Sequence, residues 1–343
     1  MRLSFCSTLW LIYLTTVCFF AATYKDHAAC DAQTRGTSFA TANVLSMAPR
    51  KAILISNPKT GRYAARRRPV EDLAQQLESL GVKVDLRSTQ GPGDATKIAA
   101  RAAGNGTSDV IVAGGDGTIN EAIQGLAGTK ARLSIIPRGT GNVLARELGL
   151  PLDDEQAIKI VAQGKSRQIY LGLAIDETTH ESRHFVLMAG IGLDASVVRR
   201  VQPSLKKRIG KGAFWVSGLS HLATWNPRPF ILEINGHNYT STFAAIGKAA
   251  KYGGNLAITP GARLDQPEFE ICIIDTRSRL RYLHLLSHAM RNGMPRNTPE
   301  VQFVNATTVK AHGDAHVQID GELLGHLPMR FEIAPHSLEI IVP

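Results

Sequence analysis

The chain has 343 residues, of which 44% are hydrophobic and 20% charged, so it is long enough for two globular domains with buried cores. Its four cysteines exclude a disulfide scaffold and favour a reducing compartment. The net charge of +10 indicates an anionic partner, such as a nucleotide or an acidic membrane surface, unless the protein is simply a soluble basic one. Aromatic residues make up 6% and do not alternate with basic ones, so no nucleic-acid partner is expected.

Residues 1–46 form a leader that contains an uncharged stretch at 3–22. This stretch is long enough to span a bilayer. It also has features of a signal peptide, with Arg2 before it and small residues after it. A third interpretation is that translation begins at Met47, because the first strand of the body starts only at Lys51.

A first strand begins at Lys51 and is followed by the run Asn57-Pro58-Lys59-Thr60-Gly61, which taken alone predicts only a turn. Apolar spacing then predicts a helix over 69–80 that stops at Gly81, and alternation predicts a strand over 82–86. Thr89 lies in the loop after that strand, and Gly93-Asp94 leads into another helix.

The stretch 110–123 predicts a buried strand, a glycine turn and a helix. Three glycines around Asp116 leave the backbone free to approach a ligand closely. We expect Thr118 to cap the helix, with Glu121 in capping-box spacing. The exposed N–H groups of such a turn form an anion site, and Asp116 is suited to hold Mg²⁺ or to orient a phosphoryl group. The run reads Gly114, Gly115, Asp116, Gly117, Thr118, Ile119, Asn120 and Glu121.

A second strand–loop–helix signal begins at Leu133 and continues into a short helix over 143–148. Two glycine loops in one α/β domain indicate a single crevice beyond the carboxyl ends of parallel strands. The 114–121 loop is neither a Walker A loop nor a dinucleotide fingerprint, and a tight strand-to-helix turn without a ligand is the alternative for it. The second loop reads Pro137, Arg138, Gly139, Thr140, Gly141 and Asn142.

The run 114–121 resembles the nucleotide loop of the diacylglycerol kinase catalytic-domain family, which includes bacterial lipid kinases and sphingosine kinases. NAD kinases and phosphofructokinases carry a related turn, but the run 137–142 is similar to the lipid kinases and argues against the other two. The 57–61 turn is similar to the family's first motif, with Thr60 in the serine place, and Thr89 matches a nucleotide-contacting threonine by spacing. The resemblance implies that these loops bind ATP.

From about residue 166 the pattern changes to short strand-like runs with turn signals between them, which predicts an all-β second domain. Helices interrupt the pattern near 205–224 and 279–292. The predicted strands are 168–175, 184–189, 230–234, 239–246, 268–274, 301–310, 315–320, 329–333 and 338–342.

Several pieces of this second half also resemble the family. The run 189–195 matches its Gly-x-Gly-x-Asp-Ala segment, which implies that Asp194 binds a substrate hydroxyl; a turn aspartate is the alternative. A later family pattern, Asp-Asp-Gly, implies a structural Mg²⁺. Here the run Leu264-Asp265-Gln266-Pro267-Glu268 replaces one carboxylate and the glycine, which puts that metal site in doubt.

Asp320-Gly321 predicts a hairpin turn when it is taken alone. In the family, the Asp-Gly-Glu at this place carries the acid that takes the proton from the attacking hydroxyl. Such a carboxylate has to lie within hydrogen-bond reach of the acceptor oxygen. The resemblance assigns the role to Glu322 first and to Asp320 second, together with Asp116 in the nucleotide loop.

We therefore predict an α/β domain with a parallel sheet at 50–165, similar to NAD kinase and diacylglycerol kinase. An antiparallel β-sandwich at 166–335 and a closing strand at 336–343 follow. The predicted activity is phosphorylation of a lipid hydroxyl with ATP and Mg²⁺; the alternatives are a kinase of a soluble metabolite such as NAD and a non-catalytic nucleotide sensor.

ATP use requires the cytosol, so the leader is expected to be an anchor or a misassigned start. The protein would then lie at the cytosolic face of a membrane, with a lipid substrate as its partner and a homodimer as one option. The basic runs 66–68 and 206–208 either face anionic lipid or belong to solvated loops.

Overall fold

The computed structural model describes residues 50–58, 68–193, 195, 227–252, 256–291, 293–296 and 298–343. The predictions for the leader, for Lys59, Thr60 and Gly61, for Asp194 and for a helix at 205–224 fall outside these residues. Across the described ranges, no helix is both long enough and apolar enough to cross a membrane.

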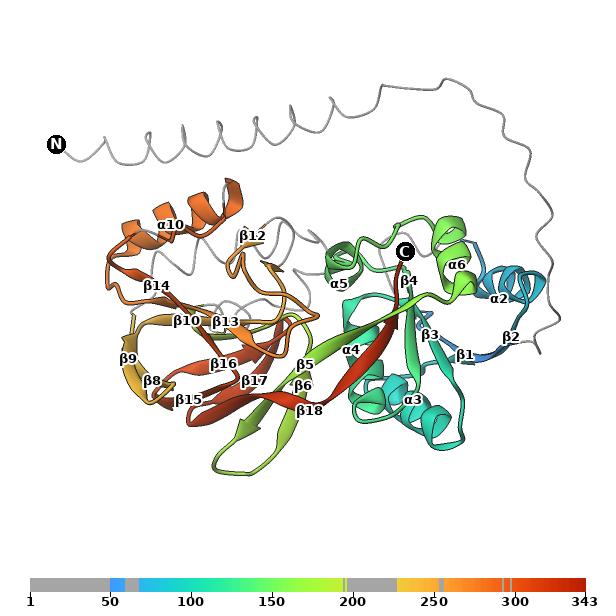
Figure 1. The fold of residues 1–343 in the computed structure, drawn as a ribbon, viewed down its shortest axis with the longest axis horizontal. Helices are drawn as coiled ribbons and strands as arrows, with labels where there is room; N and C mark the ends of the chain where they lie inside the picture. Colours follow the sequence, from blue (N-terminus) through green and yellow to red (C-terminus); the bar gives the residue numbers. More distant parts are fainter. Residues whose placement is uncertain are drawn as a thin grey trace, which may run out of the picture. The chain divides into compact units, whose positions relative to one another are not determined.

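The first half of the described chain is a parallel sheet with helices on both faces (Figure 1). Its strands lie in the order β2-β1-β3-β4, and each neighbouring pair is parallel. All six residues of β3 are buried, as expected for a strand covered on both sides. The strands are β1 (Arg50–Ser56), β2 (Val82–Ser88), β3 (Asp109–Gly114) and β4 (Arg132–Pro137).

Side chains that alternate along these strands form two separate cores. Leu54 and Ile111 pack in a cluster with residues of α2 and α6, whereas Ile55 and Val112 pack in a cluster with residues of α3 and α4. The Asp153 side chain caps α6 by accepting from the Gln156 N–H at 3.1 Å. The helices are α2 (Val70–Ser79), α3 (Asp94–Gly104), α4 (Asp116–Leu126), α5 (Val143–Glu147) and α6 (Asp154–Gln163).

The second half is mainly antiparallel β-structure. One sheet has the order β14-β13-β10-β7-β16-β17, and its inner residues share a core with those of β8, β15 and β18 in the other sheet. The Phe185 ring stacks on Phe269 with centroids 5.7 Å apart, which joins the two sheets. The remaining elements are β5 (Ser166–Asp176), β6 (Ser182–Phe185), β7 (Met188–Gly192), β8 (Phe230–Ile234), β9 (His237–Ser241), β10 (Phe243–Gly247), β11 (Lys251–Tyr252), β12 (Leu256–Ala257), β13 (Phe269–Ile274), α10 (Arg279–Arg291), β14 (Val301–Ala306), β15 (Thr308–Gly313), β16 (His316–Ile319), β17 (Glu322–His326) and β18 (Met329–Ile341).

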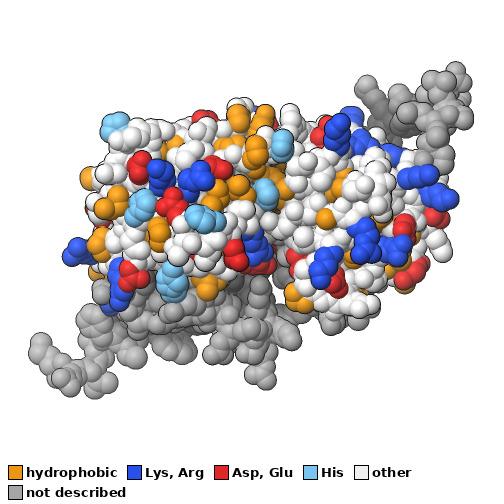
Figure 2. Space-filling view, turned by 90° about the horizontal axis from the view of Figure 1, so that it is seen from below, with side chains coloured by type: hydrophobic (Ala, Val, Ile, Leu, Met, Phe, Trp, Pro, Cys, Tyr) orange, Lys and Arg blue, Asp and Glu red, His pale blue; other side chains and the backbone are white. Residues whose placement is uncertain are grey.

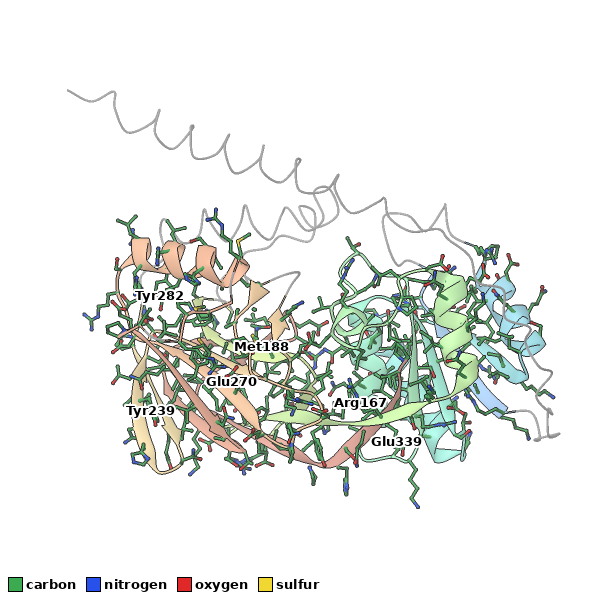
Figure 3. All side chains as sticks on the ribbon, turned by 45° about the horizontal axis from the view of Figure 1, so that its top comes forward. Arg167, Met188, Tyr239, Glu270, Tyr282 and Glu339 are labelled. Carbon is green, nitrogen blue, oxygen red and sulfur yellow. The ribbon has the colours of Figure 1, made fainter. Side chains whose placement is uncertain are left out.

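Strand β18 joins the two halves. Near its start it pairs with β15, and near its end Ile340 pairs in parallel with Leu133 of β4. β5 runs antiparallel to β18 for most of its length, and Figure 3 marks this junction with Arg167 of β5 and Glu339 of β18. The last strand of the chain therefore extends the parallel sheet of the first half.

Three predicted strands were wrong in the same way. Each of the runs 184–189, 239–246 and 301–310 is two strands, and in each case the first strand belongs to one sheet and the second to the other. None of the three runs has a glycine or proline where the chain turns between the packed sheets, so the residue pattern does not reveal the break. Conversely, the predicted strands 329–333 and 338–342 are one strand with an irregularity between Ile333 and Ser337.

Candidate active site

Three loops meet at one edge of the parallel sheet because β1, β3 and β4 are parallel and adjacent. Asn57 follows β1, and its Nδ2 donates to the Thr118 hydroxyl of α4 at 3.3 Å. The Arg138 N–H, just after β4, donates to the Gly114 carbonyl at the end of β3 at 2.8 Å. Thr89, directly after β2, is 7% exposed, and its N–H donates to the Ser56 carbonyl at 2.8 Å. The described nucleotide-loop residues therefore gather at this edge.

The two glycine loops touch each other through their backbones. A Cβ on Gly139 would lie 2.5 Å from the Gly115 Cα, and a Cβ on Gly141 would lie 2.5 Å from Oδ2 of Asp116. Real Cβ atoms do not come so close to a backbone carbon, so position 139 requires glycine for close approach, whereas a Cβ on Gly141 would displace the Asp116 carboxylate. The contact fixes the second loop against the first turn of α4.

We expect Gly139→Ala to lower the free energy of unfolding by about 1–3 kcal/mol, because the added methyl group has to push two backbones apart. Gly104→Ala is the matched control, since it adds the same methyl group at the end of α3 where nothing lies within 4 Å. Urea unfolding of both variants measures the difference. Equal stabilities would show that the loops are not in firm contact.

Asp116 holds the start of the next helix as well as its own place in the glycine loop. Its Oδ1 accepts from the Val143 N–H at 2.6 Å, at the beginning of α5. Asn142 lies in the left-handed region with a φ of 50°, and its side chain accepts from the Gly139 N–H at 2.8 Å. The Val143 N–H thereby orients the Asp116 carboxylate, and Asn142 holds the loop that carries this donor, while Asp116 remains partly exposed.

The predicted capping box at Thr118 and Glu121 was wrong. Helix α4 already begins at Asp116, with Gly115 as its N-cap, so Thr118 lies inside the first turn. Its hydroxyl accepts from Asn57, and Glu121 instead accepts from the Ala95 N–H of α3 at 3.3 Å. Among the described residues no side chain forms a cap hydrogen bond at the start of α4, as expected where the first-turn N–H groups bind an anion.

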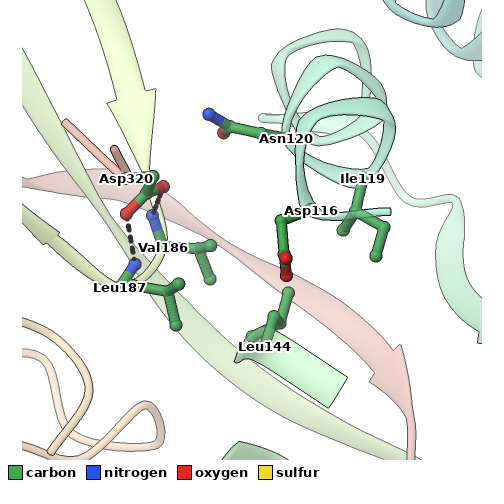
Figure 4. Close-up of a pocket in the computed structure, with 7 residues that line it drawn as sticks. All are labelled: Asp116, Ile119, Asn120, Leu144, Val186, Leu187 and Asp320. Carbon is green, nitrogen blue, oxygen red and sulfur yellow. Dashed lines mark hydrogen bonds between the residues drawn. The ribbon is translucent and has the colours of Figure 1, made fainter. Parts of the chain in front are cut away.

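A pocket lies between the first half and the second half of the described chain (Figure 4). Asp116 borders it from α4, and Asp320 borders it from the hairpin between β16 and β17. Two carboxylates from distant parts of the sequence thus share one pocket. The lining residues are Asp116, Ile119, Asn120, Leu144, Val186, Leu187 and Asp320.

The Asp320 carboxylate is held by three consecutive backbone N–H groups. Oδ2 accepts from Val186 at 2.8 Å, and Oδ1 accepts from Leu187 at 2.8 Å and from Met188 at 2.9 Å. Burial raises the pKa of Asp320 to about 6, against the lowering effect of these three hydrogen bonds. Asp320 and Gly321 have φ values of 48° and 85°, as in the hairpin turn that Asp-Gly predicts.

Glu322 lies at the surface. Its side chain is 46% exposed and forms an ion pair with Arg183 of β6. It is two residues beyond Asp320, at the first position of β17, and it does not border the pocket. Of the two acids in the Asp-Gly-Glu run, only Asp320 borders the pocket that Asp116 also borders.

No sequence pattern indicated Val186, Leu187 and Leu144 as pocket residues. Val186 and Leu187 looked like the interior of a strand at 184–189. In the structure they connect β6 to β7, and their N–H groups bind Asp320. Only knowledge of the hairpin's position could have revealed this contact.

Basic and acidic side chains lie next to each other over the face shown in Figure 2. Arg183 pairs with Glu322, and Arg330 pairs with Glu332 at 2.6 Å. In the run 66–68 only Arg68 is described, and its carbonyl accepts from Arg138 at 2.6 Å. The net positive charge is therefore locally neutralised at these positions.

Comparisons with known proteins cover both halves. The diacylglycerol kinase catalytic domain matches residues 51–174, and the YegS C-terminal NAD kinase beta sandwich-like domain matches residues 188–342. A diacylglycerol kinase from Mycobacterium tuberculosis is 32% identical over 298 residues, which cover 85% of this chain and 95% of the relative. The chain belongs to the diacylglycerol kinase family. The predicted family and lipid kinase activity are thereby confirmed, and this kinase family implies the use of ATP.

A second relative and a solved structure are also similar to this chain. A diacylglycerol kinase from Staphylococcus saprophyticus is 28% identical over 300 residues, covering 86% of this chain and 96% of the relative. The crystal structure of a diacylglycerol kinase from Bacillus anthracis has a TM-score of 0.65 at 20% identity and covers 86% of this chain and 97% of its own. The predicted fold class, an α/β half followed by an antiparallel β half, is confirmed.

Proposed function

We propose that this kinase transfers the γ-phosphoryl group of ATP to the hydroxyl of diacylglycerol at the cytosolic face of a membrane. The observation that carries the proposal is the pocket shared by Asp116 and Asp320. It brings the glycine loops of the first half next to an enclosed carboxylate of the second half. The acceptor is suggested by the names of the relatives, which are diacylglycerol kinases.

The nucleotide phosphates would lie against the edge where the loops after β1, β3 and β4 meet. Backbone N–H groups at the start of α4 and in the loop after β4 are the expected donors, aided by the helix dipole. Asp194, outside the described residues, is retained as a proposed contact of the acceptor hydroxyl. The proposed nucleotide contacts are Asn57, Pro58, Lys59, Thr60, Gly61, Thr89, Gly114, Gly115, Asp116, Gly117, Thr118, Ile119, Asn120, Glu121, Gly139, Thr140, Gly141 and Asn142.

A magnesium ion fits this site as a partner of the nucleotide rather than as a resident ion. No group of three His, Cys, Asp or Glu suited to a metal occurs among the described residues. Asp116 nevertheless offers an oriented carboxylate, and Mg²⁺ at kinase sites commonly takes one or two carboxylates together with phosphate oxygens. When bound, the ion neutralises negative charge on the phosphoryl group. Asp116 would hold it beside the helix N-terminus.

Asp320 is our first candidate for the general base, ahead of Glu322. A general base has to reach the hydroxyl proton of the acceptor, and Asp320 borders the pocket whereas Glu322 is paired with Arg183 at the surface. The three N–H groups that bind Asp320 fix the orientation of its carboxylate at the edge of the pocket. A pKa of about 6 leaves the group ionised at neutral pH yet more basic than an ordinary aspartate.

The activity is expected to fall as the pH drops below about 6, because the base must be deprotonated to accept the hydroxyl proton. Because the pKa of Asp320 is raised, this fall in activity should occur at a higher pH than the pKa range of an exposed carboxylate. The pH profile of kcat/KM between pH 4 and 8 measures it. A profile that stays flat down to about pH 4 would exclude Asp320 as the base.

A panel of acceptors tests the proposed substrate. The full chain is incubated with γ-labelled ATP, Mg²⁺ and mixed micelles of diacylglycerol, monoacylglycerol, sphingosine, ceramide or undecaprenol, with NAD as the soluble control. Label in diacylglycerol above all other acceptors is the expected result. Label in another lipid would retain the activity and change the substrate, and label in NAD alone would overturn the proposal.

A further inference from the structure

Lys248, directly after β10, has a fully buried side chain whose ammonium group lies among backbone carbonyls of a single loop. Its Nζ donates to the carbonyl of Arg263 at 3.1 Å, to that of Glu268 at 3.0 Å and to that of Gln266. An ammonium group has three N–H donors. The loop 263–268 supplies three acceptors, so donors and acceptors match in number.

The buried group is a cation at neutral pH. Burial lowers the pKa of Lys248 to about 8, whereas the nearby charges of Asp265 and Glu268 favour the protonated form. The Tyr170 ring, whose centroid is 5.9 Å from Nζ, adds a weak cation–π attraction. A buried charge is costly unless polar groups compensate it, and here backbone carbonyls do so.

The same loop does not fit a structural Mg²⁺. Both carboxylate oxygens of Asp265 are taken by the Arg263 guanidinium, at 3.0 Å from Nε and 3.0 Å from Nη2. Mg²⁺ requires a near-octahedral set of oxygen ligands. The three carbonyls that point inward are already bound by the ammonium group. The metal site implied by the family's Asp-Asp-Gly pattern is therefore not formed by these residues.

Lys248 also connects the loop to the wall of the pocket. The N–H groups of Lys248 and Ala249 both donate to the Leu187 carbonyl, at 2.8 and 3.0 Å. Leu187 borders the pocket and donates its own N–H to Asp320. On the other side, the Leu264 carbonyl accepts from the Tyr170 N–H of β5 at 2.8 Å. One residue thus joins the loop 263–268 to the segment that holds Asp320.

We propose that the tethered ammonium of Lys248 organises the loop 263–268 in place of a divalent metal ion. The positive charge comes with the chain, at the position where the family pattern implies Mg²⁺. The order of this loop is then independent of divalent cations in solution. The proposal concerns loop stability and stands apart from the identity of the lipid acceptor.

Thermal unfolding of the full wild-type chain without nucleotide tests the independence from metal. We expect the same Tm in EDTA and in excess MgCl₂ at equal ionic strength. A Tm that falls in EDTA and recovers with Mg²⁺ would overturn the proposal, because a bound metal would then hold the fold. Leaving ATP out separates this site from metal that arrives with the nucleotide.

Lys248→Met tests the ammonium group, because it removes the charge and keeps most of the side chain's length. We expect a lower Tm. We also expect hydrogen exchange of the loop amides to be faster by at least about tenfold, because losing hydrogen bonds from a charged donor lowers the free energy of opening the loop by more than a tenfold rate change requires. Lys251→Met is the matched control at an exposed lysine three residues further on, and it should leave both unchanged. Wild-type exchange in Lys248→Met would contradict the proposal.

Lys248→Ala provides a second, independent test of the ammonium group. Its unfolding is compared in ethylammonium chloride and in sodium chloride of equal ionic strength. We expect ethylammonium to raise the Tm of Lys248→Ala and to leave the wild-type Tm unchanged, because the free cation can take the place of the missing one. Equal Tm values for the variant in both salts would count against the ammonium.

Discussion

Replacing Asp116 by asparagine is expected to lower kcat for phosphoryl transfer by about 10²–10³-fold, the range found when one group that stabilises transition-state charge is lost. The change should leave the fold intact. Asparagine keeps an oxygen that can accept from the Val143 N–H, which Oδ1 of Asp116 does now at 2.6 Å. Steady-state kinetics, with Tm measured in parallel, separate the two effects.

Asp116→Ala is the companion variant, because it removes the charge and the acceptor together. We expect it to abolish transfer while the protein stays folded, with a Tm below that of Asp116→Asn because the Val143 N–H at the start of α5 loses its acceptor. Full activity in either variant would show that Asp116 has no part in the chemistry. Loss of activity together with loss of the fold in Asp116→Asn would leave only a structural role.

Replacing Asp320 by asparagine is expected to lower kcat/KM by about 10²–10⁴-fold, the usual contribution of a general base. The acid limb of the pH profile near pH 6 should disappear with it. The variant carries a structural cost, because Nδ2 of asparagine would face the Val186 N–H, now 2.8 Å from Oδ2. Rate and Tm are therefore measured on the same preparation.

Glu322→Gln is the matched control, since it makes the same chemical change two residues away at an exposed, ion-paired side chain. We expect its kcat/KM to stay near that of the wild type and its acid limb to remain. If Glu322→Gln is inactive and Asp320→Asn is active, the base is Glu322, as the family resemblance first suggested. The pair of variants thus decides between the two acids.

The first half of the fold was readable from local pattern. The apolar run of β3 and the breakers after it predict a strand, a loop and a helix without reference to distant residues. Parallel strands end at one edge of a sheet, so the meeting of Asn57 with Thr118, and of Gly115 with Gly139, follows from strand order. The capping error at Thr118 shows the limit, because a helix can start two residues earlier than its best capping side chain.

The strands of the second half were harder to predict from the sequence, because tertiary contacts decide where one strand ends and the next begins. The chain passes from one sheet to the other at Thr242 and at Thr307, where no glycine or proline marks a break. The break at 186–187 exists because those N–H groups bind Asp320, more than 130 positions later. The pocket depends on this contact. The sequence could therefore suggest Asp116 and Asp320, but not that residues 186–187 line the pocket beside them.

The most direct measurement is the initial rate at which the full chain transfers label from γ-labelled ATP to diacylglycerol in vesicles with Mg²⁺, beside Asp116→Asn. We expect labelled phosphatidic acid from the wild type and a rate lower by about 10²–10³-fold from the variant. No labelled lipid despite measurable ATP binding, or equal rates from both proteins, would contradict it.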